Sequence, residues 1–547
     1  MSGESRSRLA GVDGARLDAV VVGGGMAGAG VARELALRGV GVALFEKGDF
    51  ASGTSSKSSK LVHGGLRYLE LFDFALVRES LREKRTLERL APHLVRPLPF
   101  LVPIYPGGRR GLVTVRIGLA LYDFLAPGAG PERSRIMPPV EALSLEPSLR
   151  AEDLKGAGYY FDDLLLYPER LCLENVLSAV RHGARAHNYC EVEGLTWAAD
   201  GDCVLTVRDL LTSHVVRVRT GAVVNATGPW ADRLRDLAGV GGRQEPVVRT
   251  TKGIHCLLPR MTDRAVYLST PDARMVFVIP WREFSLVGTT DTDFDGDPDR
   301  LWATREEVEY LLDAVREVLP DPRVDLGQVR YTYAGVRPLS HAAGASASRV
   351  SRQHRVIPEG PGGRLLTVTG AKLTCFRSLA EAVGRRVLAL LGRPATGPAP
   401  SARLTLDGLD EDVALVEARV GLDVSEDLAS TGLPRETLEH QVETYGRGYG
   451  RVLELGRKLP DGLERLCPAA PTLVAQLHHA VAEEMAVSLQ DVLLRRTGLG
   501  QGPCQGVDCA EAVGQRMAEL CGWSGRRLDA ELEAYAQVVD RSQRFRG

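Results

Sequence analysis

The segment from residue 18 to residue 46 constrains the fold of this chain more than any other. Residues 18–22 form a short β-branched run, typical of a buried parallel strand, and glycines follow with the spacing G-x-G-x-x-G. Residues 26–38 carry an apolar stripe among alanines, as helices do, and residues 40–45 resemble a second strand that ends at Glu46. The glycines of the turn are Gly23, Gly25 and Gly28. This order of elements predicts a Rossmann-like βαβ unit.

Each glycine of this turn has a separate physical role. One permits the tight turn, one lets a pyrophosphate approach the backbone, and one lets helix and strand pack closely. The helix N-terminus presents free N–H groups and a partial positive charge to an anion. Glu46, 18 residues after Gly28, is placed to accept hydrogen bonds from a ribose hydroxyl. We therefore expect a bound dinucleotide, although the motif alone does not separate FAD from NAD.

Length and composition exclude several classes of protein. A chain of 547 residues predicts two or three domains, and a net charge of −2 gives no basic field for nucleic acid. No apolar run of 18 residues is present, so we expect no membrane span. The nine cysteines are scattered without C-x-x-C spacing, which favours reduced thiols in a cytoplasmic protein and no metal site. Residues 1–17 are expected to form a disordered arm.

Residues 47–70 follow Glu46 and are rich in hydroxyl groups and glycine. Such composition is typical of a flexible surface loop. However, basic side chains interrupt the run, and it continues into a helical pattern from Leu66. Hydroxyl and backbone N–H groups at a helix start also suit a second contact with a phosphate or with the edge of a flavin.

Within this segment, TSSKSSKLVHGGLRYLE (residues 54–70), after GGGMAGAG (residues 23–30), resembles the FAD-dependent glycerol-3-phosphate dehydrogenases. The resemblance extends over residues 18–500 and implies FAD as cofactor. It implies that Arg67 and Tyr68 face the substrate. The residues that it places along FAD here are Thr54, Ser55, Ser59, Lys60, Leu61 and His63.

Two later turns are expected at the same cofactor. Residues 221–230 predict a buried strand that ends in a turn of small residues, where the missing Cβ allows close approach of a ligand, although a plain turn is also possible. Residues 364–381 predict a strand, a glycine turn and a helix, and resemble the family's G-G-K-L-T segment with Ala371 as the second small residue. The cofactor residues expected in these turns are Ala226, Thr227, Gly228, Gly370, Lys372, Leu373 and Thr374.

A small anionic substrate is implied by basic residues at four further places. The family resemblance places Arg337 of residues 331–340 at the substrate, and Lys372 is expected there too. Arg352 also matches the family, but Gln353 stands where relatives usually have Asp, so the orientation of Arg352 is open. His255, central in a predicted strand, is our candidate base, with a buried structural histidine as the alternative.

The remaining patterns define the expected domains. We expect an α/β protein with a Rossmann-like FAD-binding domain, an antiparallel-sheet substrate domain and a helical C-terminal domain. The expected ranges are 18–105, 156–250 and 335–391 for the first, 106–155 and 251–334 for the second, and 400–547 for the third. The apolar residues 111–126 predict a core or domain-interface helix, with a membrane-touching helix as the alternative, and residues 156–167 predict two strands joined by a turn. The aspartates of residues 291–297 match the start of a calcium loop but lack its glutamate, so a structured turn is expected.

The basic residues suit a small dianion, and the family resemblance implies oxidation of sn-glycerol 3-phosphate to dihydroxyacetone phosphate, with hydride transfer from C2 to flavin N5. His255 is expected to act as base, or Arg337 to stabilise the forming alkoxide. The family implies membrane quinone as acceptor and peripheral contact with the inner face of the cell membrane; a homodimer is possible. The alternatives are a glycerol-3-phosphate oxidase that uses O₂, an amine or amino-acid oxidase on the same scaffold, and a non-catalytic flavoprotein.

Overall fold

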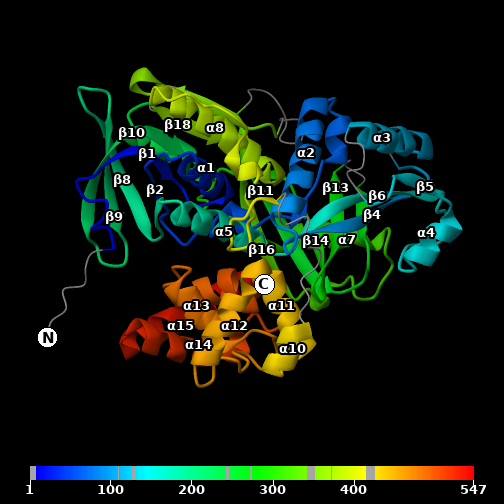
Figure 1. The fold of residues 1–547 in the computed structure, drawn as a ribbon. Coiled ribbons are helices and arrows are strands. Elements are labelled where there is room, and N and C mark those ends of the chain that lie inside the picture. The colour runs from blue at the N-terminus through cyan, green and yellow to red at the C-terminus, as the bar shows by residue number, and fades with distance from the viewer. Residues whose placement is uncertain are drawn as a thin grey trace.

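The computed structural model describes residues 8–108, 110–125, 131–241, 246–270, 274–341, 352–370, 372–413 and 425–547. Figure 1 shows two sheets side by side, with the helices of the C-terminal residues below both of them. Within the described residues, no helix is long and apolar enough to cross a bilayer.

The first sheet is parallel at its centre. Its strands are β1 (Arg16–Val22), β2 (Val42–Phe45), β7 (Arg185–His187), β8 (Cys190–Trp197), β9 (Cys203–Asp209), β10 (Val215–Asn225), β17 (Arg355–Glu359) and β18 (Leu365–Thr369). They are ordered β17-β18-β10-β1-β2-β7, and β9 and β8 extend from β10 as antiparallel neighbours. Val22 pairs with both Phe45 and Asn225, so β1, β2 and β10 end at one edge.

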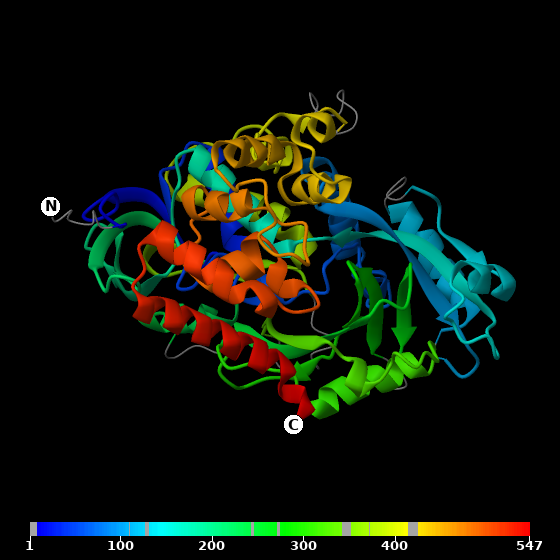
Figure 2. The same cartoon turned by 90° about the horizontal axis from the view of Figure 1, so that it is seen from below.

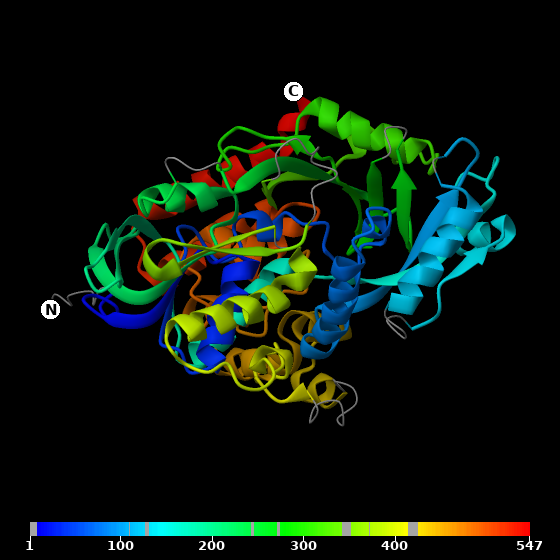
Figure 3. The same ribbon diagram turned by 90° about the horizontal axis from the view of Figure 1, so that it is seen from above.

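Helices cover both faces of this sheet. They are α1 (Met26–Leu37), α5 (Pro168–Arg181), α6 (Ala231–Leu237) and α8 (Phe376–Leu390). α1 packs between α5 and α8 on one face, as Figure 3 shows from above. On the other face, Leu234 of α6 shares a core with Leu9 and Val12, which are fully buried. The prediction of a disordered arm to residue 17 is therefore wrong from residue 8 onward, because these apolar side chains pack on the sheet; residues 1–7 lie outside the described residues.

The second sheet is mostly antiparallel and curved. Its strands are β3 (Leu61–Val62), β4 (Val95–Ile104), β5 (Arg135–Met137), β6 (Gly156–Leu165), β11 (Val248–Pro259), β12 (Ala265–Ser269), β13 (Met275–Trp281), β14 (Phe284–Gly288), β15 (Thr292–Asp293) and β16 (Tyr331–Ser340). Their order is β15-β11-β14-β13-β12-β4-β6-β3, with β16 on β11 and β5 on β6. β4 and β6 belong to this sheet, so residues 95–104 and 156–165 lie with the substrate domain, whereas the boundaries expected at residues 105 and 156 assign them to the FAD-binding domain.

The helices around the second sheet are α2 (Phe74–Leu90), α3 (Leu112–Leu125), α4 (Pro139–Leu145) and α7 (Arg305–Arg316). Leu76, Leu81, Leu87 and Leu90 of α2 are fully buried. The turn predicted within residues 156–167 is wrong: β6 is one continuous strand. Its two acidic residues stay in the sheet because Asp162 accepts hydrogen bonds from Tyr122 and Gly64, while Asp163 pairs with Lys84.

The C-terminal part is helical, as expected. Its helices are α10 (Ser425–Thr431), α11 (Arg435–Tyr445), α12 (Tyr449–Lys458), α13 (Val474–Ala482), the π-helical turn η10 (Asp491–Arg496), α14 (Val507–Cys521) and α15 (Gly525–Gln543). The 3₁₀ turns among the described residues are η1 (Thr54–Ser56), η2 (Leu66–Leu69), η3 (Gly228–Trp230), η4 (Leu326–Gln328), η6 (Pro361–Gly363), η7 (Leu373–Cys375), η8 (Pro400–Ala402), η9 (Gly446–Gly448), η11 (Leu499–Gln501) and η12 (Arg544–Arg546). Figure 2 shows α15, in red, running beside the second sheet, where Thr332 of β16 donates a hydrogen bond to the carbonyl of Ser542.

Candidate functional site

One large cavity, of about 2080 Å³, lies where the two sheets and the C-terminal helices meet. Its walls come from the β1–α1 turn, residues 46–59, the ends of β10 and β18, and strands β11 and β16. These segments are far apart in the sequence. The parallel pairing of β1, β2 and β10 brings their carboxyl ends together, which is where ligands bind in open α/β sheets.

The glycine turn after β1 is packed tightly against neighbouring backbone. Gly23 has φ +105°, and a Cβ there would lie 2.6 Å from the carbonyl oxygen of Ala226. A Cβ on Gly28 would lie 1.8 Å from the carbonyl oxygen of Gly23. Neither position has room for a side chain, so both require glycine, and Gly23 and Gly25 of this turn line the cavity with backbone alone.

Glu46 and Ser55 complete this end of the cavity. The Glu46 carboxylate accepts hydrogen bonds from the N–H groups of Gly24 (2.6 Å) and Gly48 (2.8 Å). Burial raises the pKa of Glu46, and the two backbone N–H groups oppose that shift. Ser55 Oγ accepts from Met26 N–H (2.8 Å), at the first residue of α1. A carboxylate and a hydroxyl therefore flank the N-terminus of α1.

His255 lies at the other end of the cavity, on β11. Its side chain is 2% exposed, its ring stacks on Tyr333 with centroids 4.9 Å apart, and Nε2 lies 2.8 Å from Ser59 Oγ. Nδ1 is buried without a hydrogen-bond partner among the described residues. Burial, and then the charges of Arg337 and Lys60, hold the pKa of His255 well below 6.5. The imidazole is therefore neutral at pH 7 and able to accept a proton.

Arg337 and Arg352 share one carboxylate that sequence reasoning missed. Arg337 donates to Asp291 (3.2 Å) and to Thr289 Oγ1 (2.7 Å), and Arg352 donates to the other oxygen of Asp291 (3.3 Å). Burial opposes ionisation of Asp291, but the two arginines lower its pKa below the usual value of 3.8. Asp291 thus supplies the orienting carboxylate that Gln353 lacks.

Lys372 joins this cationic end of the cavity. Its Nζ donates to the carbonyl of His63 (2.5 Å) and lies 5.2 Å from the ring centroid of Tyr68. Burial lowers the pKa of Lys372 to about 8, and burial, followed by the charges of Arg352, lowers that of Arg337 to about 10. Both groups remain mainly cationic at pH 7. Arg67 lines the same wall.

The predicted site residues divide into two groups. The cavity is lined by Gly23, Gly25, Glu46, Thr54, Ser55, Ser59, His63, Arg67, Tyr68, Ala226, Thr227, Gly228, His255, Arg337, Arg352, Gly370, Lys372 and Leu373. The structure does not bring Lys60, Leu61 and Thr374 to its surface. Lys60 is buried beside Glu169, 3.7 Å away, Leu61 packs in the apolar core, and Thr374 accepts a hydrogen bond from the N–H of His63. Gly28 acts through packing, and Ala371 lies outside the described residues.

Comparisons with known proteins agree with this geometry. A family model described as FAD dependent oxidoreductase matches residues 18–374, and one described as the C-terminal domain of alpha-glycerophosphate oxidase matches residues 402–528. The chain is 36% identical over 541 residues to a glycerol-3-phosphate dehydrogenase of Synechocystis sp., covering 96% of each protein. It is 34% identical to the aerobic glycerol-3-phosphate dehydrogenase of Bacillus subtilis over 493 residues, 88% of this chain and 87% of that one.

The chain belongs to the family of FAD-dependent glycerol-3-phosphate dehydrogenases. Its fold is also similar to a solved glycerol-3-phosphate dehydrogenase of Bacillus halodurans in complex with FAD, with a TM-score of 0.78 and 27% identity over 98% of this chain and 97% of that one. Glycine oxidase of Geobacillus kaustophilus, at a TM-score of 0.52 and 22% identity, shares the fold.

The cavity of this family member fits FAD. The glycine turn has no room for a Cβ, it opens an α-helix at the carboxyl end of β1, and Glu46 lies beside it, bonded to the N–H of Gly24. His63, Lys372 and His255 line the same cavity as the glycine turn, and its volume of about 2080 Å³ leaves room for a dinucleotide.

The C-terminal part also contributes to the cavity, which the sequence did not indicate. Gln490, Leu494 and Arg495 line it beside Asp49, and α15 adds Arg541. Local sequence patterns around residues 486–500 give no sign of this, because these side chains reach the cavity only through tertiary docking. Arg495 and Arg496 both form salt bridges with Asp49.

Proposed function

We propose that this chain oxidises sn-glycerol 3-phosphate to dihydroxyacetone phosphate and passes the electrons to a membrane quinone. The observation that carries the proposal is the meeting of four cationic side chains and a neutral histidine at one end of a dinucleotide cavity. The cations are Arg67, Arg337, Arg352 and Lys372. Of the acidic groups nearby, Asp291 is paired with two of these arginines.

Excess positive charge in a partly buried site suits a phosphate dianion. Arginine binds phosphate oxygens in pairs, and its planar fork holds the ligand in one orientation. Asp291 accepts hydrogen bonds from both guanidinium groups and restricts their motion, so little side-chain freedom is lost when substrate binds. Lys372 adds a point charge whose position is set by the carbonyl of His63.

In this proposal FAD, when bound, supplies the acceptor for the hydride from C2. His255 takes the proton of the C2 hydroxyl group, since its lowered pKa keeps it unprotonated before substrate arrives. The negative phosphate raises the proton affinity of the imidazole once substrate is bound. Arg337 stabilises negative charge that develops on the C2 oxygen, and the remaining cations align the substrate.

A membrane contact is supported by α3. Val113, Ile117 and Phe124 are 71%, 63% and 77% exposed and lie on one face of this helix, at spacings of four and seven residues. Val115, Leu119 and Tyr122 on the opposite face are buried, so the prediction of a core helix holds for one face. An exposed apolar stripe of this kind suits the interfacial region of a bilayer, where quinone resides.

An anaerobic titration tests the reaction. Addition of glycerol 3-phosphate to the FAD-loaded protein should bleach the visible flavin absorbance, whereas glycerol, which lacks the phosphate, should not at the same concentration. Glycine tests the amino-acid oxidase alternative, which predicts bleaching by glycine and none by glycerol 3-phosphate. Reoxidation by a quinone analogue rather than by air supports the acceptor; rapid reoxidation by air favours the oxidase alternative.

A further inference from the structure

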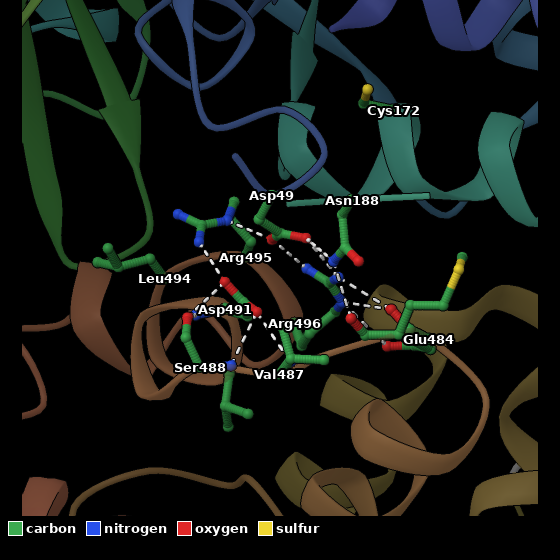
Figure 4. A network of polar contacts seen from close by, with 12 residues as sticks. Asp49, Cys172, Asn188, Glu484, Val487, Ser488, Asp491, Leu494, Arg495 and Arg496 are labelled. Atoms are coloured by element: carbon green, nitrogen blue, oxygen red, sulfur yellow. Dashed lines mark hydrogen bonds and ion pairs between the residues drawn. The ribbon is translucent and has the colours of Figure 1, made fainter. Parts of the chain in front are cut away.

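A carboxylate next to the cofactor cavity is held by two adjacent arginines from the C-terminal domain. Asp49 lies in the loop after β2, and Arg495 and Arg496 lie on η10, more than 440 residues later. Arg495 Nε is 2.5 Å from Asp49 Oδ2, and Arg496 lies 2.7 Å and 2.9 Å from the two oxygens. Figure 4 shows both guanidinium groups directed at this one side chain.

The arginines are themselves fixed on the C-terminal side. Asp491 accepts a hydrogen bond from Arg495 (2.7 Å), and its second oxygen accepts from the N–H groups of Val487 and Ser488 (2.9 and 3.0 Å). Arg496 donates to the carbonyl of Glu484. Adjacent residues of a regular α-helix point about 100° apart, so the wider π-helical turn here accompanies two side chains that converge on one target.

Three of these four charged side chains are almost fully removed from water, and Arg495 is partly exposed where it lines the cavity. Asp49 is 1% exposed, Asp491 0% and Arg496 2%. Although burial raises the pKa of an isolated carboxyl group, Arg496 and Arg495 bring that of Asp49 below its usual range. A buried ion pair contributes little net stability compared with apolar packing, but it fixes geometry strongly once formed. Net stability alone therefore does not explain this cluster, whereas a role in holding the neighbouring loop in position does.

The loop that Asp49 belongs to is the one that shapes the cofactor end of the cavity. Three residues earlier, Glu46 binds the N–H groups of Gly24 and Gly48, and two residues later the N–H of Ala51 donates to the carbonyl of Gly24 (3.0 Å). The loop is thus bonded to the glycine turn on both sides of Asp49. Any displacement of Asp49 is transmitted to Glu46 and to the turn that receives the pyrophosphate.

We propose that Arg495 and Arg496 are positioning residues for FAD. They hold residues 46–51 in the shape that receives the cofactor, so FAD binding and the seating of residues 484–501 on the first sheet stabilise each other. This linkage is reciprocal: whatever free energy domain seating contributes to FAD affinity, FAD contributes to domain seating. The proposal rests on FAD in this cavity and does not depend on the substrate or the electron acceptor.

The first test measures FAD affinity by fluorescence titration of the FAD-free protein. Asp49→Asn, Arg496→Met and the double variant should each bind FAD about tenfold or more weakly, within the usual range of coupling between sites. Arg447→Met is the matched control, because Arg447 forms a similar pair with Asp407 (2.5 Å) away from the loop. It should keep the wild-type affinity for FAD. Wild-type affinity in the folded Asp49 and Arg496 variants would overturn the proposal.

A second measurement applies to the wild-type protein and does not require any variant to fold. Hydrogen exchange should slow at the backbone amides of residues 484–501 when FAD is added, and by more than at residues 435–458, which serve as internal reference. Equal changes in the two segments, or none in residues 484–501, would contradict the linkage. Both tests use FAD without substrate, so their failure leaves the proposed dehydrogenase activity untouched.

Discussion

At the scale of single residues, the site depends on charges that are held before the substrate arrives. Asp291 is the clearest case: it gives Arg337 and Arg352 a common anchor, and the pair then presents its remaining N–H donors to the cavity. His255 is prepared differently, since burial and nearby cations keep it neutral. Preorganised charges of this kind act most strongly in a site shielded from water.

Replacement of Arg337 by alanine tests the most central of these charges. The variant should retain FAD, because Arg337 lies at the substrate end, while kcat/KM for glycerol 3-phosphate falls by about two orders of magnitude, the scale of losing one oriented charge. Steady-state kinetics and the flavin spectrum measure both effects. Arg249→Ala is the control: Arg249 forms an ion pair with Asp293 (2.7 Å), a neighbour of this site, and does not line the cavity. Equal kinetics in wild type and Arg337→Ala would remove the assigned role.

Asp162 offers a residue-scale test of stability against pH. Burial, opposed in part by Lys84 and Tyr122, raises the pKa of Asp162 to about 6 from 3.8. A raised carboxyl pKa favours the folded state at low pH, and this contribution is lost as the pH rises from about 4 to about 6. Asp162→Asn keeps an oxygen for Tyr122 and Gly64 but does not titrate.

The free energy of unfolding of Asp162→Asn, relative to wild type, should therefore increase by roughly 2.5 kcal/mol between pH 4 and pH 8. Urea unfolding at a series of pH values measures the difference. A constant difference across this range would mean that Asp162 titrates normally in the folded protein.

At the scale of secondary structure, α3 combines two roles on opposite faces. Tyr122 on its buried face donates a hydrogen bond to Asp162 (2.7 Å), which in turn accepts from the N–H of Gly64 beside His63. The exposed stripe of Val113, Ile117 and Phe124 faces away from the protein. The helix that presents apolar side chains outward is thus bonded to the segment that carries Arg67 and Tyr68.

If α3 is the membrane contact, an acidic stripe should abolish it. Ile117→Glu with Phe124→Glu should lower co-sedimentation with anionic lipid vesicles by about tenfold or more, because burial of two large apolar side chains is lost and two like charges are added. Val140→Glu is the control, since Val140 is 80% exposed on α4, outside the stripe. Turnover with a soluble electron acceptor should stay unchanged. Undiminished vesicle binding by the double variant would place the contact elsewhere.

The difference between local patterns and contacts among strands also explains which features could be predicted from the sequence. The βαβ unit was predictable because strand, glycine spacing, helix and acid are all local patterns, and the segment from Thr54 to Glu70 has a distinctive signature. Asp291 was not, because its contacts with Arg337 and Arg352 depend on how β11, β15 and β16 lie together. Lys60 was misplaced for a related reason: its signature identifies the segment, but only the pairing of β3 with β6 and the position of Glu169 turn the side chain inward.

At the scale of the whole molecule, buried ion pairs join the C-terminal helices to the FAD-binding part of the chain. Arg170 of α5 pairs with Glu174 on its own helix and with Glu484 of the C-terminal domain, where His479 lies 3.3 Å from the same carboxylate. Together with the cluster at Asp49, this pair makes docking of the two parts sensitive to protonation. Apolar interfaces do not have this property.

Glu484 provides the corresponding prediction. Burial opposes its ionisation, but Arg170 and then His479 lower the pKa of Glu484 to about 2 from 4.5. A lowered carboxyl pKa gives stability that is present above pH 4.5 and is lost as the pH falls toward 2. Glu484→Gln should therefore lower the free energy of unfolding by about 3 kcal/mol at pH 7 and by roughly a third less at pH 3.5. Urea unfolding of the two proteins at each pH measures the difference. Arg96→Met removes a more exposed pair that joins β4 of the second sheet to Glu443 of the C-terminal part, and its effect should stay below about 1 kcal/mol. A Glu484→Gln effect as small as this would mean that buried charge does not hold the two parts together.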